Sequence, residues 1–135
     1  MPHISFEYSA NLDGDLDMKG FCEALRAAAV QTGVFEPAGI RVRAARGADY
    51  PIADGHPDHA SIDISTRLRG GRPLETRKAA TSAIFEAAEA FLADLFVRRP
   101  LALSMEMRDI DPDLAPKASS IRDHMKRRQD GPAAG

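Results

Sequence analysis

The residue with the most distinctive chemistry in this chain is Pro2, at the start of the sequence. If the initiator Met1 is removed, the proline nitrogen becomes a secondary amine, whereas within a chain it is an amide without useful basicity. An α-amino group titrates at roughly 7.7–8.0 in model peptides, and burial or nearby arginines would lower that pKa further. Such a base suits proton transfer next to a carbonyl group. Pro2 is therefore a candidate general base.

The residues that follow Pro2 are typical of a β-strand. Apolar and polar side chains alternate from His3 to Tyr8, which is the period-two pattern of a strand with one buried face. Most chain ends are poorly ordered unless secondary structure ties them down. The sequence therefore predicts that a sheet holds Pro2 in place. The alternative interpretation is an ordinary second residue without a role.

Two other groups of reactive side chains are less favoured as sites. Cys22 lies beside the apolar stripe of a predicted helix without an apparent histidine partner, so we interpret it as a small core residue and not a nucleophile. His56, Asp58 and His59 lie at the end of a Gly- and Pro-containing stretch, which predicts a loop. Their spacing does not bring ligands together and no second cluster completes a shell, so we predict solvated side chains and no metal site.

The composition of the chain fits one globular domain. Its 135 residues are 44% hydrophobic and 28% charged, with a net charge of −2. These are ordinary values, and they give no electrostatic reason to expect a nucleic-acid or membrane partner. There is no apolar run of the roughly 18 residues that a spanning helix needs, and no signal-peptide pattern. The single cysteine excludes an internal disulfide and fits a reducing compartment, so we expect a cytoplasmic protein.

Four predicted strands and two predicted helices position the candidate residues. Alternating patterns predict strands over 3–8, 40–44, 60–68 and 101–107. The first helix follows a cap at Asp15 or Asp17 and ends before Gly33. The second begins near Pro73 and ends before Pro100.

This order of elements predicts two β-α-β units, and hence an α/β (α+β) fold. With right-handed crossovers, both helices lie on one face of a four-stranded mixed sheet. The other face carries polar side chains, namely Ser5, Glu7, Arg41, Asp63, Ser65, Ser104 and Glu106. Such a domain is thin, and oligomerisation would cover the polar face. We place the domain at 1–127, with a short helix or arm over 118–128, and expect a disordered tail over 128–135.

Short motifs in this order and spacing resemble a known family. They are Pro2-His3, Gly33-Val34-Phe35, Ala38-Gly39-Ile40-Arg41-Val42-Arg43, Ala53-Asp54-Gly55-His56, Gly71-Arg72-Pro73-Leu74-Glu75-Thr76-Arg77 and Leu101-Ala102-Leu103-Ser104-Met105-Glu106. Over residues 1–127 the chain resembles the 5-carboxymethyl-2-hydroxymuconate isomerase family of the tautomerase superfamily, which has an amino-terminal proline.

The resemblance implies a homotrimer with the proline at the mouth of a pocket. Pro2 would be the general base that moves a proton between carbons of an unsaturated dicarboxylate. Arg41 and Arg72 would bind the carboxylates and the developing oxyanion, tasks that suit cationic side chains. No cofactor is implied, because an amine and arginines suffice for a proton shift. The implied reaction is that of 5-carboxymethyl-2-hydroxymuconate delta-isomerase in homoprotocatechuate (4-hydroxyphenylacetate) catabolism.

Three alternatives remain open from the sequence. Arg43 could take the role of Arg41, and without the resemblance either would be interpreted as a solvated charge. The same scaffold could act on another unsaturated acid by tautomerisation or hydration, which a panel of substrates would separate. If Met1 is retained, the nitrogen of Pro2 is an amide and the chain would be a non-catalytic trimeric binding protein. An intact mass would decide that point.

Overall fold

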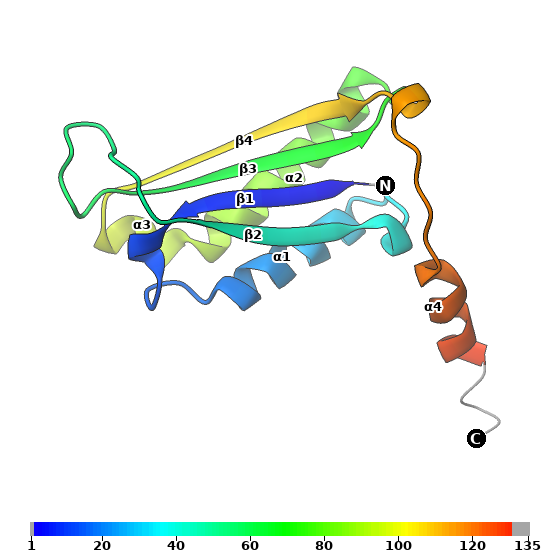
Figure 1. Ribbon diagram of the computed structural model, residues 1–135, viewed down its shortest axis with the longest axis horizontal. Helices are drawn as coiled ribbons and strands as arrows, with labels where there is room; N and C mark the ends of the chain where they lie inside the picture. Colours follow the sequence, from blue (N-terminus) through cyan, green and yellow to red (C-terminus); the bar gives the residue numbers. More distant parts are fainter. Residues whose placement is uncertain (1, 131–135) are drawn as a thin grey trace.

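A computed structural model describes residues 2–130 and confirms the predicted architecture (Figure 1). The first β-α-β unit consists of β1 (His3–Ser9), α1 (Met18–Gln31) and β2 (Arg41–Gly47). The second consists of β3 (Ala60–Arg69), α2 (Leu74–Phe91) and β4 (Leu101–Ile110). The shorter helical segments are η1 (Ala10–Leu12), η2 (Pro37–Gly39), α3 (Ala93–Arg98), η3 (Pro112–Leu114) and α4 (Ile121–Asp130).

The four strands form one mixed sheet in the order β2-β1-β3-β4. Within each unit the two strands are parallel, whereas the central pair, β1 and β3, is antiparallel. The start of β1 therefore lies beside the end of β3, and His3 is opposite both Arg41 and Arg67. Residues that are distant in sequence thus share one end of the sheet.

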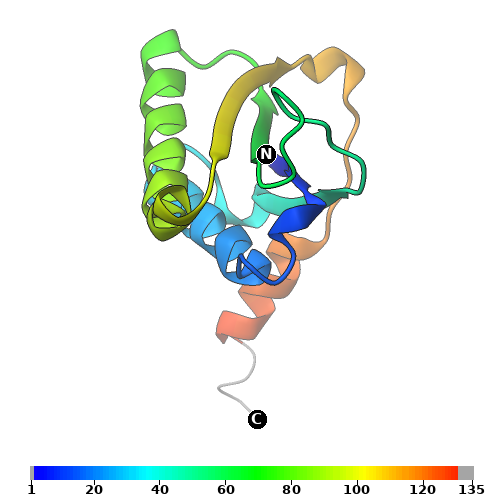
Figure 2. The ribbon, with the colours of Figure 1, turned by 90° about the vertical axis from the view of Figure 1, so that its left-hand side faces the viewer.

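The hydrophobic core lies between one face of the sheet and helices α1 and α2, which Figure 2 shows on the same side. The predicted alternation in β1 and β3 is confirmed, because Ile4, Phe6, Ile62 and Ile64 are buried. Phe21 of α1 links sheet and helices, since its ring centroid lies 4.9 Å from that of Phe6. Helix α1 is therefore anchored to the strand that follows Pro2.

The predicted ends of α1 are also found in the structure. Of the two candidate caps it is Asp17 that caps the helix, accepting a hydrogen bond of 3.0 Å from the backbone N–H of Gly20. Asp15 is instead paired with Arg99, at 2.8 Å. After the helix, Gly33 has a φ of +70°, the left-handed conformation that favours glycine.

The second predicted helix is split in two. Leu92 separates α2 from α3 because its backbone angles, φ −93° and ψ 3°, are not helical. Leu92 and Leu95 are both buried, so the break directs α3 onto the same core. The apolar stripe continues through both helices, which is why the sequence pattern predicts only one.

After β4 the chain leaves the domain as an arm that crosses the end of the sheet and continues into α4 (Figure 1). No side chain of α4 is buried, and Arg122 pairs with Glu36 next to η2. Residues 128–130 belong to α4, where the sequence predicts the start of a disordered tail; residues 131–135 of that tail lie outside the described residues. None of the helices within 2–130 is long and apolar enough to cross a membrane.

Candidate active site

The structure places Pro2 at the first position before β1, where its side chain is buried. The carbonyl oxygen of Pro2 accepts a hydrogen bond of 3.2 Å from the backbone N–H of Arg41. This bond continues the β1–β2 ladder by one residue. Pro2 is therefore tied to the sheet, as the strand pattern predicts.

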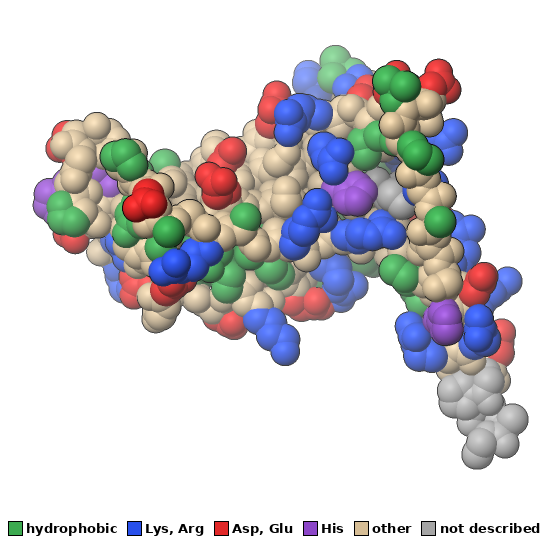
Figure 3. Space-filling model, viewed as in Figure 1, with side chains coloured by type: hydrophobic (Ala, Val, Ile, Leu, Met, Phe, Trp, Pro, Cys, Tyr) green, Lys and Arg blue, Asp and Glu red, His purple; other side chains and the backbone are tan. Residues whose placement is uncertain are grey.

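The sheet face opposite the helices is polar, with basic side chains at the end near Pro2 and acidic side chains nearer the other end. The row nearest Pro2 crosses all four strands and consists of Arg41, His3, Arg67 and Arg108. Glu7 and Asp63 face each other nearer the other end. Figure 3 shows this separation, with Lys and Arg side chains gathered around a histidine on the open face. The end of the sheet that holds Pro2 is thus strongly basic.

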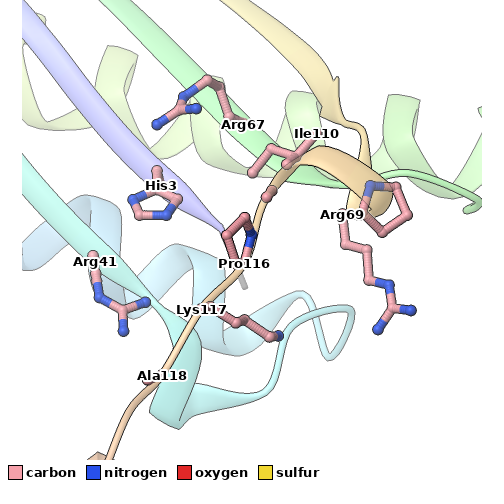
Figure 4. A pocket seen from close by; sticks show the side chains of 10 residues that line it. His3, Arg41, Arg67, Arg69, Ile110, Pro116, Lys117 and Ala118 are labelled. Atoms are coloured by element: carbon pink, nitrogen blue, oxygen red, sulfur yellow. The ribbon is translucent and has the colours of Figure 1, made fainter.

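A cavity of about 630 Å³ lies at this basic end, between the sheet and the arm (Figure 4). Its charged walls are Arg41, Arg67, Arg69 and Lys117, and His3 lies beside them. No Asp or Glu lines the cavity. These four cations form no ion pair within residues 2–130, although other arginines of the chain do. The cavity is therefore a concave site with uncompensated positive charge, which attracts anions.

His3 is the titratable group at the centre of this site. Burial, together with the charges of Arg67, Arg43 and Arg41, lowers the pKa of its imidazole below the usual value. Its Nδ1 is buried without a hydrogen-bond partner in the described part of the chain. A neutral imidazole next to Pro2 adds no further cation to the site.

The two arginines singled out from the sequence lie in different surroundings. Arg41 lines the cavity, where one of its N–H groups donates to the carbonyl of Gly39 at 3.1 Å. Arg72 does not line it, because its guanidinium donates to the carbonyls of Arg69 (3.0 Å) and Val34 (3.4 Å). The same group lies over the ring of Phe35, 5.5 Å from its centroid. Arg43, the alternative to Arg41, is absent from the cavity wall.

The remaining candidates are distant from this site. Burial raises the pKa of the Cys22 thiol, which disfavours the thiolate that a nucleophile needs. In the loop before β3, the side chain of His59 is hydrogen-bonded to Asp54 at 2.7 Å. No group of three or more His, Cys, Asp or Glu residues within 2–130 is arranged to hold a metal ion.

Sequence reasoning missed three of the cations of the cavity, namely Arg67, Arg69 and Lys117. The alternating pattern of β3 already places Arg67 on the polar face. It does not show that β3 runs antiparallel to β1, which is what brings Arg67 next to His3. Lys117 reaches the cavity through the path of the arm, which has no periodic pattern to predict it.

Comparisons with known proteins identify the family of this chain. A family model described as 5-carboxymethyl-2-hydroxymuconate isomerase matches residues 2–125. The 5-carboxymethyl-2-hydroxymuconate Delta-isomerase of Escherichia coli is 34% identical over 121 residues, which are 90% of this chain and 96% of that protein.

Solved structures extend the similarity to three dimensions. A crystal structure of a 5-carboxymethyl-2-hydroxymuconate delta-isomerase has a TM-score of 0.86 at 29% identity, with 93% of each chain covered. A fused 4-OT symmetric trimer shares the fold, with a TM-score of 0.60 at 20% identity over 87% of this chain and 92% of that chain. The chain therefore belongs to the 5-carboxymethyl-2-hydroxymuconate isomerase family, and it is an isomerase of tautomerase-like fold.

Proposed function

We propose that this enzyme isomerises 5-carboxymethyl-2-hydroxymuconate, with Pro2 as its general base. The observation that carries the proposal is the cavity beside His3, which is lined by Arg41, Arg67, Arg69 and Lys117 without any acidic side chain. Pro2, the residue before His3, is buried and is not part of the cavity wall. A substrate with several carboxylates supplies the missing negative charge. Charge-assisted hydrogen bonds from arginine to carboxylate are among the stronger polar contacts in proteins.

The reaction is a proton shift along a conjugated chain. After removal of Met1, the secondary amine of Pro2 takes the proton from the 2-hydroxyl group. The electron pair left on that oxygen moves into the chain, the oxygen becomes a carbonyl, and a carbon of the former diene accepts the proton back from the proline. One O–H bond is lost and one C–H bond is formed, so no cofactor is needed.

The surroundings of Pro2 favour its neutral, basic form. Arg41 lies opposite His3 on β2, and its backbone N–H is hydrogen-bonded to Pro2, so it brings positive charge close to the proline. Positive charge and burial both disfavour a protonated amine. The same positive charge stabilises the dienolate that forms when the hydroxyl proton leaves. Arg41 is the arginine best placed for this. The role of Arg72 in binding a carboxylate rests on the sequence resemblance alone, because its guanidinium lies outside the cavity wall.

We further propose that three chains assemble into a homotrimer that works in the cytoplasm. One face of the sheet carries no helix (Figure 2), and a fused trimer of the same fold is known. The single cysteine fits a reducing compartment. Homoprotocatechuate catabolism is the pathway in which such a substrate arises.

An ultraviolet assay of the Pro2→Ala variant tests this proposal. The conjugated dienol absorbs differently from the enone product, so turnover of 5-carboxymethyl-2-hydroxymuconate can be followed directly. We expect the variant to lose roughly 100-fold or more in kcat, because a positioned general base contributes about 10²–10⁴-fold.

Two controls make the result interpretable. Intact masses of both proteins show whether Met1 has been removed, and circular dichroism shows whether the fold is retained. An equally active variant would contradict the role of Pro2. Wild-type protein that lacks Met1 but does not turn over this substrate would contradict the choice of substrate, and would favour another unsaturated acid.

A further inference from the structure

The cations of the cavity outnumber those that the proposed reaction uses. The reaction assigns roles to Arg41 and Arg72, and Arg72 lies outside the cavity wall. Arg67 lies inside it and has no assigned role. The side chain of Arg67 also forms no hydrogen bond or ion pair within residues 2–130, whereas that of Arg108 in the same row donates to Ser65 (3.0 Å) and pairs with Glu106 (3.7 Å). The guanidinium of Arg67 is therefore free to bind a ligand.

The position of Arg67 relative to Pro2 follows from the sheet. Arg41 and Arg67 are both opposite His3, one on each side of β1. Neighbouring strands are about 4.8 Å apart, so the backbones of the two arginines are separated by about 10 Å. Guanidinium groups that extend from these two positions can bind carboxylates on opposite sides of one substrate with a six-carbon main chain that lies over His3.

The other two cations of the cavity are farther from Pro2. Arg69 is opposite Ile110, at the end of β3, and its side chain points away from His3 (Figure 4). Lys117 belongs to the arm that covers the cavity. Arg67 is thus the cation on β3 that is nearest to the reacting end of the site.

The substrate carries one more carboxylate than a plain muconate. A muconate has a carboxylate at each end of its chain, and the carboxymethyl arm adds a third. We propose that Arg67 is a specificity-determining residue, which binds the carboxylate of the carboxymethyl arm. The inference rests on the proposed function and adds to it the residue that selects 5-carboxymethyl-2-hydroxymuconate over a muconate without the carboxymethyl arm.

The experiment compares two substrates that differ only in this arm, 5-carboxymethyl-2-hydroxymuconate and 2-hydroxymuconate. In Arg67→Gln we expect kcat/KM for the first to fall about 10- to 100-fold, which is the typical contribution of a hydrogen bond to a charged group. For the second substrate we expect a change of less than about 3-fold. The matched control is Arg108→Gln, which removes an arginine from the same row but outside the cavity and should leave both values within about 3-fold.

A binding measurement keeps the inference testable if neither substrate is turned over. Tricarballylate is glutarate with one additional carboxylate, and both are unreactive. The imidazole of His3 reports occupancy by NMR, because an anion among the arginines that lower its pKa should raise it again. We expect the wild type and Arg108→Gln to bind tricarballylate more tightly than glutarate, and Arg67→Gln to lose that preference.

The possible outcomes separate the two proposals. No turnover by the wild type contradicts the proposed substrate, and the binding preference then decides the role of Arg67 alone. Equal losses on both substrates in Arg67→Gln, no loss on either, or an unchanged preference for tricarballylate would overturn the inference. If the Arg67→Gln protein has a lower assembled mass in solution than the wild type, the inference would also be overturned, because Arg67 would then hold subunits together.

Discussion

His3 connects the electrostatics of the site with a property that can be measured without substrate. Burial and the positive charges of Arg67, Arg43 and Arg41 lower its pKa in the folded protein. In the unfolded chain these groups are dispersed, and the imidazole returns to a pKa of about 6.5. Folding therefore opposes protonation of this one side chain.

The consequence is a dependence of stability on pH below about 6.5. Between the folded and unfolded pKa values the unfolded chain binds more protons, so the free energy of unfolding falls as the pH falls through this window. Above 6.5 the side chain is neutral in both states and contributes no such slope. We expect urea titrations from pH 7.5 to 5 to show this loss in the wild type and a smaller loss in His3→Gln.

The carboxylates of the chain are the same in the wild type and in His3→Gln, so their contribution cancels in this comparison. Asp15, whose pKa is lowered first by its hydrogen bond to Arg99, titrates well below the window. Identical slopes in the wild type and His3→Gln would show that the cations around His3 do not act on it in solution. The same comparison at high salt checks the cause, because screening weakens the charge–charge part of the effect.

At the level of strands and helices, part of the site could be predicted from the sequence. Alternation in β1, β2 and β3 assigns side chains to a face, so the polar face and the place of Arg41 on it were predictable. The pairing of β1 with β3 was not, because strand order and direction depend on long-range packing. Likewise, the apolar stripe of the second helix predicts burial of Leu92 and Leu95 but contains no signal for the break at Leu92.

The helical layer carries a prediction about stability. Ile84 lies on the buried side of α2 and is 0% exposed. Ile84→Ala leaves a cavity between α2 and the sheet, and we expect it to lower the free energy of unfolding by about 2–5 kcal/mol. Urea denaturation at one fixed protein concentration measures this, because assembly would otherwise contribute.

Val97 of α3 offers the matched control. It is 86% exposed, and Val97→Ala should change the free energy of unfolding by no more than about 0.5 kcal/mol. Similar losses in both variants would contradict a core located between the sheet and α2. Such a result would instead indicate that Val97 contacts another subunit.

The whole molecule has helices on one face of its sheet and charges sorted along the other. The uncovered face is basic in the row of His3 and acidic toward Glu7 and Asp63. The middle and the acidic end of such a face can pack against another copy, which leaves the basic end free for the substrate. Closed symmetric assembly would cover this part of the face on every subunit.

Ser65 provides a test of that assembly, since it lies near the middle of the uncovered face, opposite Ser5 and Glu106. A long cation fits there in an isolated chain, because no helix covers this face (Figure 2). In an assembled trimer the same side chain would be forced into the interface. We expect light scattering of the wild type to give about three times 14.6 kDa, and Ser65→Arg to give a folded species of lower mass. The control is Ser82→Arg, the same change on the exposed side of α2, which should remain trimeric. A trimer in both variants would show that the interface does not include Ser65. A monomeric wild type would contradict the proposed trimer.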